Sequence, residues 1–399
     1  MKEATQAEIN IGMIGHVDHG KTSLVQALTG KWADTHSEEL KKGISIRLGY
    51  ADASFYRCEN CKGSESYSNK EKCPNCGKKG TLLRKVSFVD APGHETLMAT
   101  MLSGASLMHG AILVIAANEH CPQPRTVEHL MALSITDTKD IIVVQNKIDL
   151  VSKEAAEENF KQIKGFLKDY GYESAPIIPI AAHFGTNVDL LIETIEKTIK
   201  TPKFDSSKEL KMYVVRSFDV NKPGTKPSEL NGGVIGGSIL QGELIEGSEI
   251  EITPGLEDKN ILTKAVALSV SEGRIRKAKP GGLIAVQTLL DPNLTKSDLM
   301  RGQIVSKTGK MPAPTRQLRL EVYALKRLLS KSLGEVKVND LLVLTVGTMT
   351  GVGNVVKQSG KNEFEVALKN SVVIEKGQKV AISKRDGSSW RLAAYGISK

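Results

Sequence analysis

The sequence lacks long apolar runs, internal repeats and low-complexity tracts, and each absence excludes a class of protein. Its longest apolar stretches, such as residues 110–117 (GAILVIAA), are far shorter than the ~20 residues that a membrane-spanning helix needs. A repeat at a fixed period would indicate a solenoid, and we find none. The N-terminus, MKEATQAE, is polar and shows no signal peptide. We therefore expect a cytoplasmic protein that has no membrane partner.

Cysteine is also scarce, with five in 399 residues, and a reducing cytosol argues against disulfides. Four of the five form two C-x2-C pairs that are separated by eleven residues. Such pairs place four thiolates for tetrahedral Zn²⁺, although cysteines that serve redox chemistry are the alternative. The segment between the pairs has only Tyr67 to bury, so a metal would stabilise it. We predict a structural zinc knuckle over residues 57–79, with the ligands Cys58, Cys61, Cys73 and Cys76.

The overall composition is that of a globular protein, with 40% hydrophobic and 25% charged residues. The length allows two or three domains. The net charge of +9 suits a partner such as RNA, but a lysine-rich surface explains it equally well. Two basic clusters are candidate RNA contacts: Arg274, Arg276, Lys277 and Lys279, and Arg316, Arg319, Lys326 and Arg327.

Residues 15–22 (GHVDHGKT) match the pattern of a phosphate-binding loop, G-x4-G-K-[ST]. Gly15 and Gly20 would let the backbone turn tightly, so that successive N–H groups point at the β-phosphate. Lys21 would reach the β and γ oxygens, and the Thr22 hydroxyl would ligate Mg²⁺. A predicted strand precedes the loop and a predicted helix follows it, which is the order that anion binding requires. The alternative is a glycine-rich turn with a solvated lysine.

Residues 146–149 (NKID) follow the apolar run at 140–145, so they would lie at the carboxyl end of a buried strand. Ligands of open α/β sheets bind at that edge. The carboxylate of Asp149 can accept hydrogen bonds from the ring N–H and the exocyclic amine of guanine, a pair that adenine does not offer. Asn146 and Lys147 would brace the base and the phosphate loop. An ordinary strand end is the alternative.

Residues 90–94 (DAPGH) follow another predicted strand and have the composition of a phosphate-sensing switch. Asp90 could hold Mg²⁺ through water, and the N–H of Gly93 could meet the γ-phosphate. His94 would then orient the attacking water, as a glutamine does in other GTPases. Upstream, the hydroxyl of Ser45 could reach the metal when the triphosphate orders its loop.

Strand and helix patterns alternate over residues 1–203 and predict a largely parallel sheet with helices on both faces. The strands are expected at 9–14, 47–56, 82–90, 110–117, 140–146 and 176–181. The helices are expected at 21–30, 95–108, 124–134, 154–170 and 187–200. The zinc pairs lie between two of these strands, at the tip of a hairpin, and residues 201–209 indicate a linker.

From about residue 210 the pattern changes to short strands broken by glycine, which favour closed β-barrels. The segment PAPT at 312–315 indicates the junction between two such barrels. We therefore predict an α/β P-loop GTPase domain with a zinc-knuckle insertion, followed by two small β-barrels. The expected domains are 1–203 for GTP binding, 210–313 for β-barrel domain II and 314–399 for β-barrel domain III.

Together these sequence motifs resemble those of a known protein family. GHVDHGKT, HSEELKKGISI, DAPGHE, NKID and two barrels are similar to the translational GTPases that carry aminoacyl-tRNA, such as elongation factor Tu. The zinc insertion, with SFDVNKPG, LDPNLTKSDLMRG and WRLAAYGI, resembles the gamma subunits of translation initiation factor 2. The short N-terminus is similar to that of the archaeal members.

The resemblance implies a GTPase that uses GTP/GDP, Mg²⁺ and Zn²⁺ and hydrolyses GTP slowly without a partner. It implies a heterotrimer with alpha and beta subunits. In the GTP state such a factor binds methionylated initiator tRNA, delivers it to the small ribosomal subunit and releases it after hydrolysis.

Family roles transfer to matching positions of this sequence. The resemblance implies His94 as the catalytic residue, screened by Val17 and Ile44. The implied nucleotide contacts are Asp18, His19, Gly20, Lys21, Thr22, Ser23, Gly93, Asn146, Lys147, Asp149, Ala181, Ala182 and His183. The implied magnesium site contains Thr22, Ser45, Asp18, Gly43 and Asp90.

Two positions depart from the family pattern. The usual effector-loop threonine is Ser45 here, so the hydroxyl is kept and a methyl group is lost. The usual serine–alanine pair near the guanine carbonyl is Ala181–Ala182, which leaves the backbone N–H of Ala182 for that contact.

Three other interpretations remain open from the sequence. A selenocysteinyl-tRNA elongation factor shares the strings but would need a further C-terminal domain. A GTP-binding assembly scaffold would hold the nucleotide without useful hydrolysis. A metabolic P-loop kinase is disfavoured by NKID and DAPGH.

Overall fold

The computed structural model describes residues 4–31, 48–92, 98–325, 335–387 and 389–399. The chain divides into two compact units. The described residues from Ala7 to Pro202 form the first unit, and those from Lys203 onward form the second together with residues 4–6. None of the helices within the described ranges is both long and apolar enough to cross a membrane.

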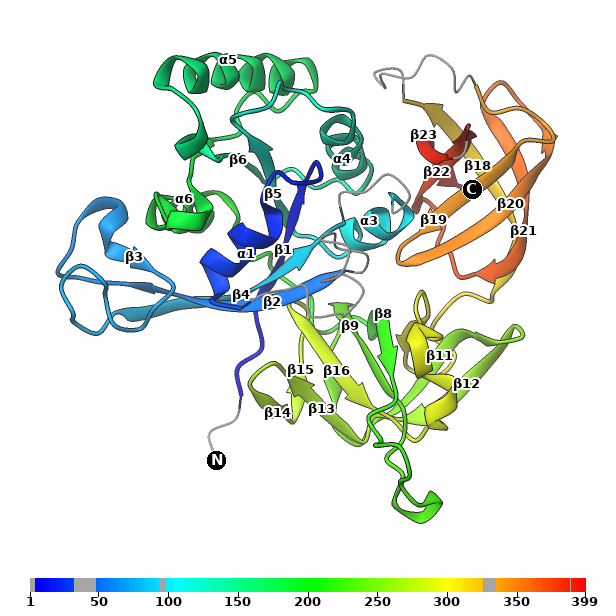
Figure 1. Ribbon diagram of the computed structural model, residues 1–399. Helices are drawn as coiled ribbons and strands as arrows, with labels where there is room; N and C mark the ends of the chain where they lie inside the picture. Colours follow the sequence, from blue (N-terminus) through cyan, green and yellow to red (C-terminus); the bar gives the residue numbers. More distant parts are fainter. Residues whose placement is uncertain (1–3, 32–47, 93–97, 326–334, 388) are drawn as a thin grey trace. The chain divides into compact units, whose positions relative to one another are not determined.

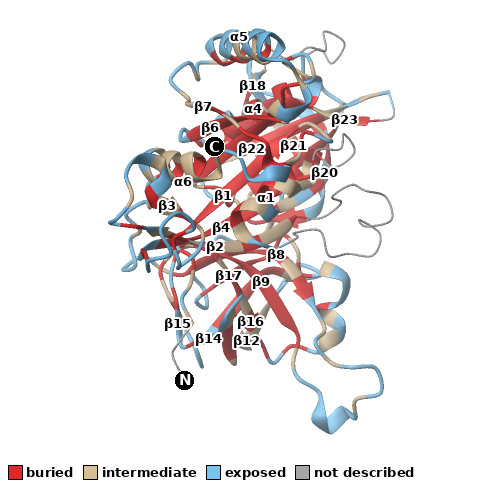
Figure 2. Cartoon of the chain, turned by 60° about the vertical axis from the view of Figure 1, so that its left-hand side comes forward, coloured by how far each residue is buried: buried red, intermediate tan, exposed pale blue. Residues whose placement is uncertain are grey.

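A seven-strand sheet is the centre of the first unit, in the order β3-β2-β4-β1-β5-β6-β7 (Figure 1). Its parallel strands are β4 (Thr81–Asp90), β1 (Ile9–Gly15), β5 (Gly110–Ala116), β6 (Ile141–Asn146) and β7 (Ile177–Pro179). At one edge β2 (Gly49–Arg57) runs antiparallel to β4, and the short β3 (Tyr67–Ser68) pairs with β2. The parallel strands are almost continuously buried (Figure 2) because helices cover both faces of the sheet.

Within the described residues the α-helices are α1 (Lys21–Thr29), α3 (Met98–Ala105), α4 (Pro124–Ile135), α5 (Lys153–Asp169) and α6 (Val188–Thr198). Helices α1 and α6 share a core with alternate residues of β1, whereas α3 and α4 lie over the opposite face (Figure 1). Each strand and helix predicted for this unit has a counterpart among the described residues, with ends that shift by a few residues. Strand β3 was not predicted, because two residues are too few to show a period.

A buried arginine connects the C-terminal segment of this unit, including α6, to strand β4 of the sheet. Arg84 on β4 is 7% exposed, and its Nε lies 2.7 Å from a carboxylate oxygen of Glu196 on α6. Its Nη2 donates to the carbonyl of Ile199 at 2.6 Å and its Nη1 to the hydroxyl of Thr201 at 3.1 Å. The guanidinium thus satisfies the carbonyl of Ile199, the residue that directly follows α6, which no helical N–H can reach.

The second unit begins with an eight-strand antiparallel sheet in the order β12-β11-β17-β8-β9-β16-β13-β14. Its strands are β8 (Lys211–Phe218), β9 (Val234–Gln241), β11 (Glu249–Leu256), β12 (Lys259–Lys264), β13 (Ala267–Val270), β14 (Gly273–Ile275), β16 (Leu283–Gln287) and β17 (Ile304–Ser306). A two-strand ribbon, β10 (Leu244–Ile245) and β15 (Lys277–Ala278), shares one apolar core with this sheet. The strands surround this single core, which is consistent with the β-barrel that the sequence predicted.

The C-terminal part is a closed barrel in the order β18-β21-β20-β19-β22-β23, as the sequence predicted. Its strands are β18 (Thr315–Ala324), β19 (Leu341–Val346), β20 (Met349–Gln358), β21 (Glu363–Val372), β22 (Lys379–Asp386) and β23 (Ser389–Ser398). Alternate residues of each strand face a single apolar core.

Side chains of the two β folds of the second unit contact each other directly. The ammonium of Lys211 on β8 lies 2.7 Å from a carboxylate oxygen of Glu375 in the closed barrel. Beside this ion pair, the amide of Gln378 donates to the hydroxyl of the buried Tyr213 at 3.3 Å. A Cβ on Gly347 would lie 2.6 Å from the Tyr213 ring, so only glycine leaves room for it. These contacts explain why both β folds belong to one compact unit.

We predict that Arg84→Ala lowers the free energy of unfolding of the first unit by about 3 kcal/mol, because Glu196 and the end of α6 lose a buried partner. Chemical denaturation of the full chain measures the effect. The matched control is Lys197→Ala on the same helix, since this lysine is exposed and pairs only at the surface. Equal unfolding midpoints for the two variants would contradict the prediction.

Candidate nucleotide site and metal centre

The loop between β1 and α1 is shaped by two glycines. Gly15 has φ 141° and Gly20 has φ 89°, both in the range that disfavours side chains. A Cβ on Gly15 would lie 2.3 Å from the carbonyl oxygen of Val114, and one on Gly20 would lie 2.3 Å from the amide nitrogen of Asn146. Asp18, between them, also has a positive φ of 59°. The loop therefore turns tightly at both ends, and α1 begins directly after it.

Lys21 is buried and its ammonium points back over this loop. It donates to the carbonyls of Gly15 at 3.0 Å and of His16 at 2.6 Å. The positive charge is thus held close to the N-terminus of α1, whose first N–H groups have no partner within the helix. A concave loop, a helix N-terminus and a lysine together form an anion site for phosphate.

Thr22 and Asp90 bring two oxygen donors together beside the anion site. The Thr22 hydroxyl donates to a carboxylate oxygen of Asp90 at 2.8 Å. Asp90 is the last residue of β4 and is fully buried. A hydroxyl and a carboxylate next to phosphate oxygens match the hard oxygen ligands that Mg²⁺ prefers. Gly43, Ser45, Gly93 and His94, which complete the predicted set, lie outside the described residues, as does Ile44.

Asn146, at the end of β6, connects three segments of the site. Its amide nitrogen donates to the carbonyl of His19 in the phosphate loop at 2.9 Å. Its amide oxygen accepts from the backbone N–H of Ala182 at 3.1 Å. Ala182 therefore contacts Asn146 through the same N–H that the sequence assigned to the guanine carbonyl. This contact was not anticipated, because no local pattern pairs residues that are 36 positions apart.

The remaining base-site candidates surround this junction. Lys147 has φ 62°, and Asp149 is exposed in a short 3₁₀ turn, η3 (Ile148–Leu150). Ala181 is buried, and His183 lies in a second turn, η4 (Ala182–Phe184), with its ring 5.1 Å from that of Phe184. The exposed carboxylate of Asp149 is available to a ligand at the carboxyl edge of the sheet.

A cavity of about 870 Å³ adjoins the site. Ser23, Ala182 and His183 line it together with residues of α1, α6 and the segment after β3. The sequence predicted these three residues as nucleotide contacts. It did not predict the wall that Tyr67 and Asn69 contribute, since those residues belong to the cysteine insertion.

His19 is fully buried and its ring points toward β5. One ring nitrogen lies 3.0 Å from the carbonyl of Val114, and the other lies 3.3 Å from a carboxylate oxygen of Glu119. Burial lowers the pKa of His19, which favours the neutral ring. Only the backbone of His19 therefore faces the loop interior. Glu119 was not predicted as its partner, because nothing in the local sequence pattern distinguishes that residue.

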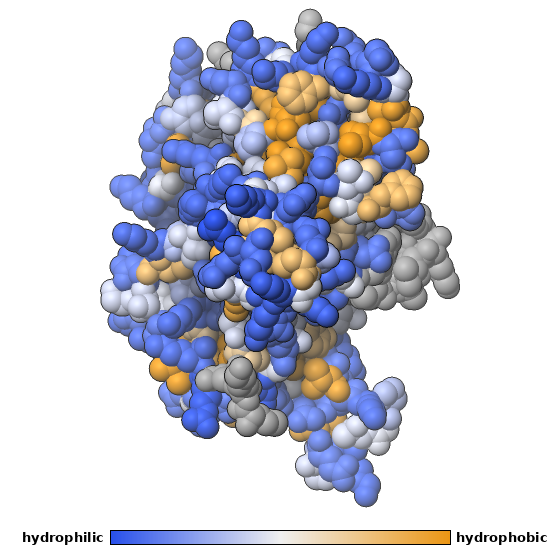
Figure 3. Space-filling view, turned by 90° about the vertical axis from the view of Figure 1, so that its left-hand side faces the viewer, coloured by the Kyte–Doolittle hydropathy of each residue, from blue (hydrophilic) through white to orange (hydrophobic). Residues whose placement is uncertain are grey.

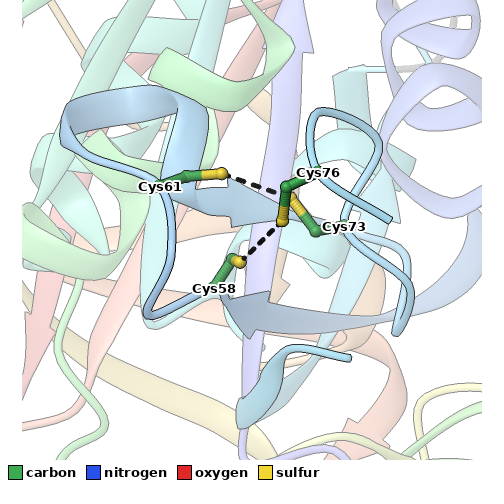
Figure 4. Close-up of side chains that lie close together, drawn as sticks. All are labelled: Cys58, Cys61, Cys73 and Cys76. Atoms are coloured by element: carbon green, nitrogen blue, oxygen red, sulfur yellow. Dashed lines mark hydrogen bonds between the residues drawn. The ribbon is translucent and has the colours of Figure 1, made fainter. Parts of the chain in front are cut away.

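The four paired cysteines converge at the tip of the β2–β4 hairpin (Figure 4). All four sulfur atoms lie within 4.8 Å of one another, with Cys58 and Cys76 at 3.4 Å and Cys61 and Cys73 at 3.7 Å. A tetrahedral zinc ion with Zn–S bonds of about 2.3 Å holds its sulfurs about 3.8 Å apart. The donor set therefore fits zinc, with no position left for a substrate.

The thiols differ in how readily they ionise. Backbone N–H groups, that of Cys76 first, lower the pKa of Cys73 to about 7. Desolvation raises the pKa of Cys61 to about 12. Because zinc binds thiolates, binding of the metal would release protons from these thiols. Cys121 is buried outside the cluster, and burial raises its pKa to about 12.

The basic clusters proposed for RNA are largely neutralised by acidic neighbours. Arg274 pairs with Glu246, Lys277 with Glu243, Arg316 with Asp258 and Arg319 with Glu365. Lys326 and Arg327 lie outside the described residues. The face drawn in Figure 3 is mostly hydrophilic, and its apolar side chains form separate patches. The four ion pairs favour a solvated charged surface at Arg274, Lys277, Arg316 and Arg319.

Comparisons with known proteins agree across the chain. Residues 6–201 match the family model "Elongation factor Tu GTP binding domain", and residues 316–398 match "Initiation factor eIF2 gamma, C terminal". The translation initiation factor 2 subunit gamma of Methanococcus maripaludis is 54% identical over 100% of both chains. The same subunit of Methanothermobacter thermautotrophicus is 53% identical over 99% of both chains, and that of Pyrococcus furiosus is 53% identical over 100% of this chain and 99% of its own.

Two solved structures share the fold. A bacterial selenocysteine-specific elongation factor, EF-Sec, has a TM-score of 0.76 at 24% identity and matches 98% of this chain but only 58% of its own. Elongation factor SelB from Methanococcus maripaludis has a TM-score of 0.72 at 22% identity, over 99% of this chain and 80% of its own. At these identities the likeness concerns the fold alone.

We predict that the purified protein contains about one zinc ion per chain, because four thiolates complete its coordination. Cys73→Ser should lose the metal, which elemental analysis would measure. Cys121→Ser is the matched control and should keep it, since that thiol is buried elsewhere. A folded wild-type protein without zinc would contradict the assignment.

Proposed function

We propose, from the premise that the chain belongs to the gamma-subunit family of translation initiation factor 2, that it binds methionylated initiator tRNA when GTP occupies the site. Family membership rests on full-length relatives at 53–54% identity. The protein is a GTP-binding initiation factor and a translational GTPase, with GTP/GDP and Mg²⁺ as cofactors. Delivery of the tRNA to the small ribosomal subunit and its release after hydrolysis belong to the same proposal.

The observation that carries the proposal is the junction at Asn146. One carboxamide joins the phosphate loop, the NKID turn and the Ala181–Ala182 segment. Phosphate and base recognition are therefore coupled in a single rigid edge of the sheet. Within this edge we assign the phosphates to residues 18–23 and the guanine to Asn146, Lys147 and Asp149, with Ala181, Ala182 and His183 beside it.

We assign the switch function to two chain segments: the one that continues from Asp90 at the end of β4, and the one that contains Gly43 and Ser45. Asp90 ends β4 next to Thr22, and the chain continues from it into DAPGH. We assign Ser45 and Gly43 to the metal region, Gly93 to the γ-phosphate and His94 to the attacking water. Loss of the γ-phosphate would remove the contacts that order these segments, as in other GTPase switches.

The partners follow from the family as proposals. We propose a heterotrimer with alpha and beta subunits that acts in the cytoplasm and has no membrane partner. We also propose the boundaries 1–203, 210–313 and 314–399 for the GTP-binding domain and the two β domains. The full-length identity of 53–54% to gamma subunits favours this assignment over a selenocysteinyl-tRNA factor, since the two elongation factor structures are only 22–24% identical to this chain.

We predict that charged initiator tRNA is retained by the protein at least about 10-fold better with GTP than with GDP, a ratio within the usual range of allosteric coupling. Filter binding with both nucleotides measures it. Asp149→Asn serves as the matched variant, because it should lose guanine recognition and therefore need far more GTP to retain the tRNA. Equal retention with GTP and GDP in the wild type would refute the proposed switch.

We predict that His94→Ala lowers ribosome-stimulated GTP hydrolysis by about 100-fold or more while leaving GTP affinity nearly unchanged, because a group that positions water acts mainly on the chemical step. Single-turnover hydrolysis with small ribosomal subunits and bound tRNA tests this. Unchanged hydrolysis would mean that His94 has another role and would favour a nucleotide-binding scaffold.

A further inference from the structure

A buried histidine of α4 contacts the phosphate loop from outside the motif. The backbone N–H of Gly15, the last residue of β1, donates to Nδ1 of His129 at 2.9 Å. His129 is 1% exposed. Since a backbone N–H can only donate, Nδ1 of His129 must carry a lone pair, which fixes the neutral ring with its proton on the other nitrogen.

The surroundings of His129 keep it in this acceptor state. Burial is the main cause that lowers its pKa well below the usual value, and the charges of Lys21 and Arg125 act in the same direction. The neighbouring rings of His16 and His19 add to this effect. A protonated ring could not accept from Gly15, so the same environment that excludes the proton preserves the bond.

Gly15 is the point where this bond can control the anion site. Its N–H is held by His129, and its carbonyl accepts the ammonium of Lys21. The Cα of Gly15 also lies so close to the carbonyl of Val114 that there is no room for a side chain at this position. A change in the peptide planes on either side of Gly15 would therefore move the carbonyls that aim Lys21.

We propose that His129 is a positioning residue for the phosphate loop, holding Gly15 so that Lys21 and the loop N–H groups face the nucleotide phosphates. The inference rests on the proposed assignment of residues 15–22 to phosphate binding. His129 does not touch the nucleotide itself. Its effect passes through one hydrogen bond from helix α4 to the end of β1.

Strand β1 makes a second hydrogen bond of the same kind, which can serve as a control for the bond between Gly15 and His129. Near the start of β1, the N–H of Asn10 donates to Nδ1 of His109 at 3.1 Å. Burial lowers the pKa of His109 to about 4, so this ring is also a neutral acceptor. The two histidines thus cap two amides of one strand, but only His129 contacts the phosphate loop.

The experiment compares His129→Leu with His109→Leu in the full-length protein. A buried N–H that loses its acceptor finds another by local rearrangement, at a cost that corresponds to about 10-fold or more in an equilibrium constant. We expect His129→Leu to accelerate GDP dissociation by about that factor, measured with a fluorescent GDP analogue, and His109→Leu to leave it unchanged. The hydrolysis rate at saturating GTP should stay near the wild-type value for His109→Leu, because His109 contacts Asn10 near the start of β1 rather than the phosphate loop.

Two further variants separate hydrogen bonding from packing. Asparagine can present an acceptor at the position of Nδ1, whereas glutamine presents it one bond farther out. His129→Asn should therefore restore slow GDP dissociation, and His129→Gln should not, even if the leucine variant fails to fold. Equal dissociation rates for the Asn and Gln variants, or for the two leucine variants, would overturn the proposal. A wild type that binds no GDP would instead overturn the assignment of the phosphate loop itself.

Discussion

The carboxamide of Asn146 is the contact on which the geometry of the nucleotide site depends. It donates to His19 and accepts from Ala182, so it needs a donor and an acceptor in one short side chain. Neither a carboxylate nor an aliphatic side chain can replace both bonds. Its nitrogen also occupies the space where a Cβ on Gly20 would lie, which explains why that loop residue must be glycine. The side chain of Asn146 therefore fixes the position of the NKID turn relative to the phosphate loop.

Local periodicity was sufficient to predict the nucleotide unit. The strands β1, β5 and β6 are buried throughout and mostly apolar because helices cover both of their faces, and such runs are visible in sequence. The four cysteines were equally visible, since zinc ligands of a knuckle lie close together along the chain. In both cases the determining interactions, burial of a strand and ligation of a metal, involve residues that are close together in the sequence. A local sequence motif therefore reveals them.

The rest depends on contacts between distant segments. His129 accepts from Gly15 across 114 positions, and Arg84 reaches the end of α6 across a similar span. Nothing in the neighbourhood of either residue distinguishes it from an ordinary helix or strand position. The second unit shows the same limit, because the glycine-broken strands around β8 indicated a barrel but not the order in which its strands pair.

The bond between Thr22 and Asp90 also bears on how the site would hold its metal. Thr22 uses its hydroxyl proton to reach Asp90, which leaves the lone pairs of that oxygen for a cation. A carboxylate that accepts from a ligand orients it and makes its oxygen a better donor. Asp90 would therefore act on Mg²⁺ through Thr22 and through water rather than by displacing the threonine. Because Asp90 ends β4 and is the first residue of DAPGH, the same hydrogen bond connects the proposed metal ligand Thr22 to the segment proposed to sense the γ-phosphate.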